Sequence, residues 1–454
     1  MAEARFVLDE SYRRTGDGAL IIGGSPLRLF RLTAAGQAVA DALEGGRPLP
    51  ANHRTLTDRL VDGGVIHPVA VPGVIAPRDV TVVVPAWRRV PVTTSVPGVR
   101  ETVVVDDGSD PPLTVTDARL VRLPVNRGPG AARNAGLATV TTPFVAFVDA
   151  DVELPAGWLD GLLGHLADDR VALVAPRVRT TPAASPNVDA IEAERGSLDL
   201  GPAPGRVATG SRVSYVPAAV LVCRVDALRA VGGFDETLRW GEDVDLVWRL
   251  AEAGWRCRYE PAVVVGHHAR PTVAAWLRQQ YEYGTSAAPL ARRHPGALAP
   301  LRVSGWSVGA WALATITRRP IAGAALTVGT ALALQRKLRG VSPADAARLA
   351  AAGTLAAGEQ IANAVTRTWW PIAVALLPVR RLRPVVLTAL ATPPLLGAWR
   401  ARSAHPARSV ALRLAADLAY GAGVWRGALR ERSAAALVPD LANWPPRQPA
   451  ARRG

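Results

Sequence analysis

Short runs of valine and other apolar residues alternate with helix-like segments through the middle of the chain. Three of these runs have the length of buried strands and end in turn residues: 79–85 (DVTVVVP), 101–110 (ETVVVDDGSD) and 141–153 (TTPFVAFVDADVE). Between the last two, the turn residues 128–130 (GPG) precede a helix predicted over 131–138. Strands alternating with helices are typical of α/β folds with a parallel sheet.

The zone before these strands has a different pattern. Residues 1–75 predict a β-hairpin, a helix over 33–43 capped by Thr33 and ended by Gly45, a second helix from about His53, and a small β wing. Hairpin, helices and wing together are typical of a winged-helix-like α+β domain. The next segment, VPGVIAPRD, is rich in proline and glycine and predicts a linker.

The last third of the chain is rich in Ala, Leu and Arg and is predicted to be helical, with a Pro- and Arg-rich tail (VPDLANWPPRQPAARRG). We therefore expect three parts. They are a winged-helix-like domain over 1–75, an α/β domain over 78–290 and a helical region over 291–454.

The helical region contains three uncharged stretches, 303–317, 320–335 and 384–399. Each is shorter than the ~20 residues that span a bilayer. Pro393 and Pro394 are expected to break the last of them. Arginines separate them. This pattern favours either cytoplasmic-face helices anchored by arginine to anionic lipids or a plain helical domain packed on the catalytic one. The amino terminus does not resemble a signal peptide. We expect a cytoplasmic chain, with a peripheral or integral association at the cytoplasmic face of the cell membrane left open.

The charge of the chain indicates which kinds of partner it binds, and its cysteine content indicates the compartment. The net charge of +15 is carried almost entirely by arginine and indicates anionic partners such as nucleotides, phosphates, lipid headgroups or nucleic acid. Cys223 and Cys257 lack the spacing of metal ligands, and we expect both to be small apolar residues in a reducing compartment. With 49% hydrophobic residues, the composition excludes a wholly disordered chain.

Candidate chemistry begins where the predicted strands end. Asp106 and Asp107 end one strand, and Asp149 and Asp151 follow another. Because the carboxyl ends of parallel strands form a ligand crevice, both pairs are expected on one rim of the sheet. Alternate carboxylates can share a hard divalent cation and accept hydrogen bonds from sugar hydroxyls. Acidic turn residues at strand ends are also common without any such role.

A second acidic group and a histidine pair follow. In GGFDETLRWGEDVDLVWRLAEAGW, Glu242, Asp243 and Asp245 begin a predicted helix. Such acids often only compensate the helix dipole, but a carboxylate here, near a bound sugar donor, could act as general base. His267 and His268 follow the strand-like YEPAVVVG and are either structural or part of a metal site.

Taken in order, Val-Val-Pro, Val-Val-Asp-Asp-Gly-Ser, Asn-Arg-Gly with Ala-Arg-Asn, Asp-Ala-Asp, Gly-Gly-Phe-Asp and Glu-Asp-x-Asp-Leu resemble the inverting glycosyltransferase family 2, which has the GT-A fold. The resemblance covers about 79–290. It implies a nucleotide-sugar donor and a Mg²⁺ or Mn²⁺ ion. Between Pro85 and Thr102, where the family usually has an amphipathic helix, this chain has too much Pro and Thr for a full one.

The resemblance also implies roles for individual residues. Asp243 would be the catalytic base of a single in-line displacement. The metal ligands would be Asp151 and His267, with His268 left open as the alternative. The remaining expectations are donor contacts at Pro85, Asp107, Arg133 and Asp149, and an acceptor region at Trp240 and Glu242.

The first zone bears on the acceptor. Its hairpin-first order resembles the peptide-recognition domain of pyrroloquinoline-quinone biosynthesis, which adds a peptide as a strand, and a generic winged-helix or DNA-reading domain is the alternative. Joined to family 2, it resembles the glycosyltransferases of mycofactocin biosynthesis. That resemblance implies UDP-glucose as donor, a precursor peptide or peptide-derived cofactor as acceptor, and no nucleic acid partner. A membrane lipid or polysaccharide acceptor and a non-catalytic peptide-binding protein remain as alternatives.

Overall fold

The computed structural model describes residues 5–15, 18–182, 185–338 and 340–441. The chain divides into two compact units. One consists of Met1–Arg13 and Ile22–Trp276, the other of Arg14–Ile21 and Leu277–Gly454. Most of the predicted Pro- and Arg-rich tail, from 442 onward, lies outside the described residues.

The first 75 residues form strands and two helices near the predicted positions. The side-chain oxygen of Thr33 accepts a hydrogen bond from the Gly36 N–H at 3.2 Å, and Gly45 ends the first helix. The second helix follows His53, as expected. The elements are β1 (Phe6–Leu8), which pairs antiparallel with β5 (Ile66–Pro68), the three-stranded sheet β2 (Arg13–Thr15), β3 (Leu20–Gly23) and β4 (Arg28–Arg31), and the helices α1 (Ala34–Glu44) and α2 (Arg54–Asp62).

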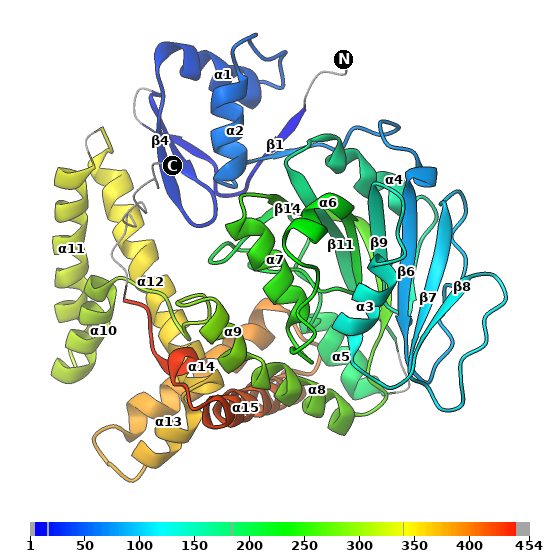
Figure 1. The fold of residues 1–454 in the computed structure, drawn as a ribbon. Coiled ribbons are helices and arrows are strands. Elements are labelled where there is room, and N and C mark those ends of the chain that lie inside the picture. The colour runs from blue at the N-terminus through cyan, green and yellow to red at the C-terminus, as the bar shows by residue number, and fades with distance from the viewer. Residues whose placement is uncertain (1–4, 16–17, 183–184, 339, 442–454) are drawn as a thin grey trace. The chain divides into compact units, whose positions relative to one another are not determined.

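A large mixed sheet forms the centre of the next part (Figure 1). Its strand order is β10-β14-β11-β13-β9-β6-β7-β8, with β12 paired to β14. The predicted strands β6, β7 and β9 are parallel, as expected, but β13 runs antiparallel to both β9 and β11. The strands are β6 (Val80–Ala86), β7 (Glu101–Asp107), β8 (Arg119–Leu123), β9 (Phe144–Val148), β10 (Val152–Glu153), β11 (Val171–Thr181), β12 (Gly205–Val207), β13 (Val220–Arg224) and β14 (Arg256–His268).

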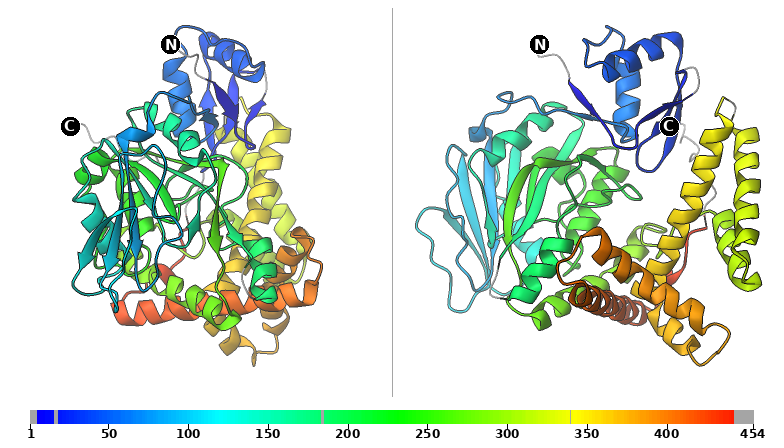
Figure 2. Two further views of the ribbon diagram at one scale, coloured as in Figure 1. Left: turned by 90° about the vertical axis from the view of Figure 1, so that its right-hand side faces the viewer. Right: turned by 180° about the vertical axis from the view of Figure 1, so that it is seen from behind.

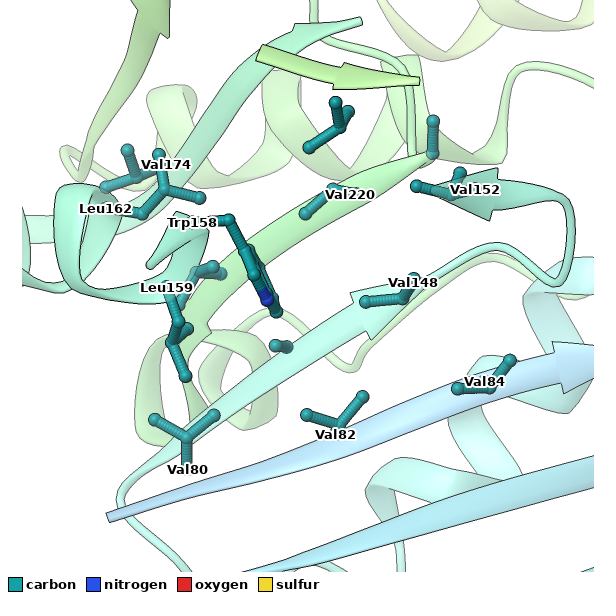
Figure 3. Close-up of a cluster of buried hydrophobic side chains, with 14 of the residues drawn as sticks. Val80, Val82, Val84, Val148, Val152, Trp158, Leu159, Leu162, Val174 and Val220 are labelled. Atoms are coloured by element: carbon teal, nitrogen blue, oxygen red, sulfur yellow. The ribbon is translucent and has the colours of Figure 1, made fainter. Parts of the chain in front are cut away.

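Alternating side chains of β6 explain how helices cover both faces of this sheet. Val82 and Val84 point into an apolar cluster with Trp158, as the close-up shows (Figure 3). Val83 faces α3, and so closely that a Cβ on Gly136 would lie 2.3 Å from its Cγ1. The helices and short 3₁₀ segments of this part are η1 (Pro77–Asp79), α3 (Pro129–Leu137), α4 (Trp158–Leu163), η2 (Gly164–Ala167), α5 (Pro186–Arg195), α6 (Val225–Ala230) and α7 (Glu242–Glu252).

Two local predictions can be compared directly with this part. Helix α3 begins at Pro129, two residues earlier than expected, because Gly128 adopts a φ of 95° and proline is favourable at the first helical position. Residues 87–100 contain no helix, in agreement with their Pro- and Thr-rich sequence. On the face of β6 and β7 opposite α3, irregular chain that includes Val96 and Val99 therefore packs against the strands.

The remaining residues are almost entirely helical. α10, α11 and α12 pack on one another (Figure 2, yellow-green to yellow). Of the helices in the described part of the chain, none is both long and apolar enough to cross a membrane. The elements are α8 (Val273–Thr285), α9 (Ala287–Arg293), α10 (Gly305–Thr317), α11 (Pro320–Lys337), α12 (Pro343–Arg367), α13 (Trp370–Leu376), α14 (Arg383–Arg400), α15 (Pro406–Glu431) and η3 (Ala435–Leu437).

The expectation that Pro393 and Pro394 break the last apolar stretch is wrong, because α14 continues through both. Each proline lacks the N–H that would bond the carbonyl four residues earlier. Those carbonyls, of Ala389 and Leu390, lie 3.1 and 3.5 Å from the Thr366 hydroxyl of α12, whose single hydrogen they share with Ala362 O of that helix at 3.0 Å. The neighbouring helix α12 thus supplies one hydroxyl donor at the place where the two prolines remove two backbone N–H donors.

Replacing the buried Thr366 with valine is expected to destabilise the helical unit by about 1–3 kcal/mol, because it leaves the carbonyls of Ala389 and Leu390 without this donor. Chemical denaturation measures the change. Thr327→Val is the matched control, since the Thr327 hydroxyl donates to Gly323 O within its own helix and its other hydrogen-bonding neighbour is the Thr354 hydroxyl, not a carbonyl that a proline has left without its N–H. Equal effects of the two substitutions would contradict this account of α14.

Candidate functional site

Two acids end β7, and the structure gives them different partners. Asp106 is fully buried and accepts hydrogen bonds from the N–H groups of Ser109 and Leu113, so it shapes the following turn. The Asp107 carboxylate accepts from the N–H groups of Arg127 and Gly128, at 2.7 and 2.8 Å. It thereby fixes the loop that leads into α3.

The residues after β9 join the sheet edge. β10 pairs with the end of β14 in a register that sets Val152 opposite His267. The Asp151 carboxylate consequently lies 3.5 Å from Nε2 of His267. His268 is directed elsewhere, with Nε2 3.3 Å from the Glu153 carboxylate. The structure therefore brings together the two residues expected to be metal ligands and separates His268 from them.

The acids at the start of α7 are held by backbone geometry. Gly241 has a φ of 82°, a left-handed conformation that glycine adopts without strain, and the helix starts directly after it. The Asp243 carboxylate accepts hydrogen bonds from the N–H groups of Val244 (2.8 Å) and Ala218 (3.2 Å). The next residue, Ala219, accepts from the Asp149 N–H. The Ala-Ala step before β13 thus joins Asp243 to Asp149.

Arg133 of α3 connects Asp149, which follows β9, with Glu242 at the start of α7. Its side chain is only 3% exposed, and its two terminal nitrogens donate to Asp149 at 2.6 Å and to Glu242 at 2.8 Å. A Cβ on Gly130 would lie 3.5 Å from the Glu242 side chain, so a small residue lets α3 approach α7 this closely. One buried guanidinium therefore fixes the spacing of two carboxylates.

The electrostatics of this cluster follow from burial. Burial raises the pKa of Glu242, neighbouring Asp243 raises it further, and Arg133 opposes both. Burial also raises the pKa of Asp243, whereas the hydrogen bonds that its carboxylate accepts from backbone N–H groups lower it. Burial alone would lower the pKa of Arg133, but Asp149 and Glu242 raise it above its ordinary value. An aspartate with a raised pKa beside a fixed cation has the character of a general base.

Asn134 is a site residue to which the sequence assigned no role. Its side-chain amide donates to Phe234 O at 2.8 Å and accepts from Phe234 N–H at 2.9 Å, much as a paired strand would. It thus ties α3 to the Gly-Gly-Phe-Asp segment that leads to α7. The signal was present in the sequence, because the asparagine belongs to the Ala-Arg-Asn motif, but its partner is a hundred residues away.

The other expected site residues lie at the margins. Pro85 is near the end of β6, in register with Val105 of β7. Trp240 immediately precedes the left-handed Gly241 and is half-buried. The roles expected of Pro85 and Trp240 stay predictions.

The Asp151 and His267 pair is the one place where the expected cation can be tested against the residues present. A carboxylate oxygen and an imidazole nitrogen are suitable ligands for Mn²⁺. Within the described ranges no cluster of three or more His, Cys, Asp or Glu side chains could hold a metal ion. The pair fits as a partial site whose further ligands would be oxygens of the diphosphate or of water.

Comparison with known proteins adds independent findings. The model of glycosyl transferase family 2 matches residues 97–197. Pre-mycofactocin glycosyltransferase of Mycobacterium tuberculosis is 41% identical, and the alignment covers 96% of this chain and 97% of that protein. The succinoglycan biosynthesis protein ExoU of Rhizobium meliloti is 31% identical over 40% of this chain and 59% of its own length.

Among solved structures, the mannosyltransferase PcManGT from Pyrobaculum calidifontis, in complex with GDP-Man and Mn²⁺, is 21% identical. The match covers 71% of this chain and 88% of that one, with a TM-score of 0.37.

Proposed function

The chain is a glycosyltransferase with a family 2 domain and belongs to the family of the pre-mycofactocin glycosyltransferases, and from this premise we propose its reaction. It transfers a hexose from UDP-glucose to a mycofactocin-related, peptide-derived acceptor, with inversion at the anomeric carbon. The observation that carries the proposal is the 41% identity over nearly the whole length of both chains.

The donor lies along the carboxyl ends of β6, β7 and β9. Asp149 accepts hydrogen bonds from the sugar or ribose hydroxyls with the carboxylate oxygen that Arg133 does not hold. Asp107 and Pro85 lie toward the nucleobase. Because Asp107 already fixes the loop before α3, its role includes positioning that loop as well as any direct contact with the base.

The chemical step depends on Asp243. Its carboxylate takes the proton from the acceptor hydroxyl while that oxygen attacks the anomeric carbon, and the diphosphate leaves on the opposite side. The N–H groups of Val244 and Ala218 hold the carboxylate in place. Glu242 and Trp240 border the acceptor, with Glu242 fixed by Arg133.

The Asp151 and His267 pair would hold the Mg²⁺ or Mn²⁺ ion. A bound cation of this kind stabilises the negative charge of a diphosphate leaving group. The contribution of the chain is the register between β10 and β14, which keeps the two side chains together before any donor binds.

Asp151→Ala is expected to lower the transfer rate at least tenfold and to weaken Mn²⁺ binding, because it removes one of two protein ligands. Transfer assays with and without EDTA, together with Mn²⁺ titration by calorimetry, measure both effects. Glu153→Ala is the matched control, since Glu153 contacts His268 instead. Full activity of the wild type in EDTA would remove the metal from this account.

The first 75 residues are proposed to present the peptide part of the acceptor. The experiment that tests the function is incubation of the purified chain with UDP-glucose, Mn²⁺ and either the precursor peptide or its modified product. Mass spectrometry should detect added hexose units on one of these acceptors. Transfer to neither, from any nucleotide hexose, would contradict the proposal.

One observation favours a second candidate, an acceptor held at a membrane surface. Residues 291–454 contain 23 arginines and lysines but five acidic residues, a net charge of +18 against +15 for the whole chain. Ile316 and Ile321 are 81% and 75% exposed, next to Arg318 and Arg319. Apolar side chains beside arginines suit an anionic lipid surface.

Sedimentation with phosphatidylserine vesicles tests this candidate. The wild type is expected to bind them more strongly than phosphatidylcholine vesicles, and Ile316→Glu with Ile321→Glu to lose most of that binding. Leu355→Glu is the control, since Leu355 is exposed but has no arginine within six positions in the sequence. Equal binding to both lipids would count against the candidate.

A further inference from the structure

Two arginines of the first unit that do not belong to the Arg133 cluster meet on neighbouring strands. Arg206 of β12 and Arg258 of β14 are directly opposite each other in an antiparallel register. Directly paired residues on neighbouring strands point to the same face, about 5 Å apart at Cβ. Like charges in such a pair repel each other, so the arrangement is unfavourable unless something compensates it.

The other charged side chains near this pair form ion pairs with one another. Arg256, two residues before Arg258, donates to Asp62 at 2.7 Å and to Asp168 at 2.8 Å. Asp58 of α2 accepts from Arg170 and Arg256. These ion pairs join α2 of the first 75 residues to the central sheet, and they use the nearby carboxylates.

Arg258 is left without a comparable partner. It is 6% exposed, its nearest carboxylate is that of Asp168 at 3.8 Å, and its Nε is buried without a hydrogen bond. In the part of the chain that the structure describes, the guanidinium groups of Arg258 and Arg206 form no hydrogen bond. Burial and the adjacent Arg256 lower the pKa of Arg258 to about 10, so it remains a cation at neutral pH.

Arg206 extends this cationic pair toward the surface. It is half-buried, and burial followed by the nearby Arg28 lowers its pKa. Arg28 itself is exposed on β4. Gly64 lies against Arg206, where a Cβ would be 3.8 Å from that of the arginine. Three arginines thus run from an exposed position to a buried one beside the first 75 residues.

We propose that Arg206 and Arg258 form a binding site for a carboxylate, entered past Arg28. Buried charges in proteins are normally paired, and an arginine with unused donors is the usual partner of a planar, bidentate carboxylate. The carboxylate comes either from a small free acid or from an acidic side chain of the peptide-derived acceptor. Only the second source rests on the proposed function.

Calorimetric titration of the full chain with glutarate, at constant ionic strength, tests the site. The wild type is expected to bind at least tenfold more tightly than Arg206→Gln or Arg258→Met. Arg348→Gln, which removes an exposed arginine elsewhere, should bind like the wild type. Glutarate affinity that is absent, or unchanged in both site variants, would overturn the proposal.

Melting temperature adds a readout that does not depend on activity. Without ligand, Arg258→Met should melt at or above the wild-type temperature, because it removes an uncompensated buried charge. With glutarate, the wild type should gain melting temperature and Arg258→Met should not. A large loss of melting temperature in Arg258→Met without ligand would show that the protein itself already compensates this arginine, against the proposal.

Two capped peptides, Ala-Glu-Ala and Ala-Gln-Ala, distinguish the sources. Preference for the glutamate peptide that Arg206→Gln abolishes identifies a peptide side chain. Glutarate binding without that preference identifies a free acid. Sugar transfer is measured separately with the same variants, so failure of the carboxylate site and failure of the proposed function give different results.

Discussion

Replacing Asp243 with asparagine is expected to lower the sugar-transfer rate by about 10²–10⁴-fold, the range that a positioned general base contributes. Asparagine keeps the shape of the side chain but cannot take the acceptor proton. Donor affinity should change little, since the proposed donor contacts are Asp149 and Asp107. Transfer rates with saturating donor and acceptor, and a separate titration of the donor, measure the two quantities.

The pH profile sharpens this prediction. A base must be ionised to act, and burial raises the pKa of Asp243 above its ordinary value. Wild-type transfer should therefore fall, as the pH is lowered, at a higher pH than an exposed aspartate would give. Asp245→Asn is a control within the same helix, since Asp245 pairs with Arg249. An Asp243→Asn variant that keeps the wild-type rate would exclude Asp243 as the base.

Arg133→Met is expected to destabilise the first unit by about 3–5 kcal/mol, because removing one partner of a buried ion pair leaves an unpaired charge. Glu242, buried beside Asp243, loses its only cation in the cluster. Transfer activity should also fall, since Asp149 and Glu242 are no longer held at a fixed distance. Denaturant unfolding and transfer rates measure the two effects.

The loss of stability should depend on pH in a defined direction. A carboxyl whose pKa is raised in the folded state favours folding at low pH and loses that contribution as the pH rises through the folded value. Without Arg133 the pKa of Glu242 rises further, so the destabilisation should be larger at pH 8 than at pH 5.5. Arg127→Met is the matched control, because Arg127 forms an exposed pair with Glu236 worth about 0–1 kcal/mol. Equal losses in both variants would contradict the role given to Arg133.

Much of the sheet could be predicted because its central strands are apolar on both faces. The valines of β6 and β7 are buried in an unbroken run, which is the pattern of a strand covered on both sides. That pattern carries no information on strand direction, and so the antiparallel β13 was not foreseen. The continuous α14 was missed for a related reason, since the donor that replaces its lost N–H groups comes from Thr366, far away in sequence.

In the candidate site, too, the sequence indicates the residues but not their contacts. Asp243, Asp149 and Asp151 stand out in the sequence because they occur within motifs at strand and helix ends. Their contacts do not stand out, because Arg133 joins Asp149, 16 residues away, to Glu242, 109 residues away. The hydrogen bonds from Ala218 and to Ala219 are made by backbone atoms, which no side-chain pattern reveals. Motifs thus indicate which residues matter, while the fold decides how they are held.

The central claim is that this chain transfers a hexose to a mycofactocin-related acceptor by a single inverting displacement. The most direct measurement is the anomeric configuration of the product, determined by NMR. The chain is incubated with Mn²⁺, the acceptor and UDP-glucose, in which the glucose is α-linked. The account predicts hexose joined uniformly in the β configuration. An α-linked product, or hydrolysis of the donor with no sugar on the acceptor, would contradict it.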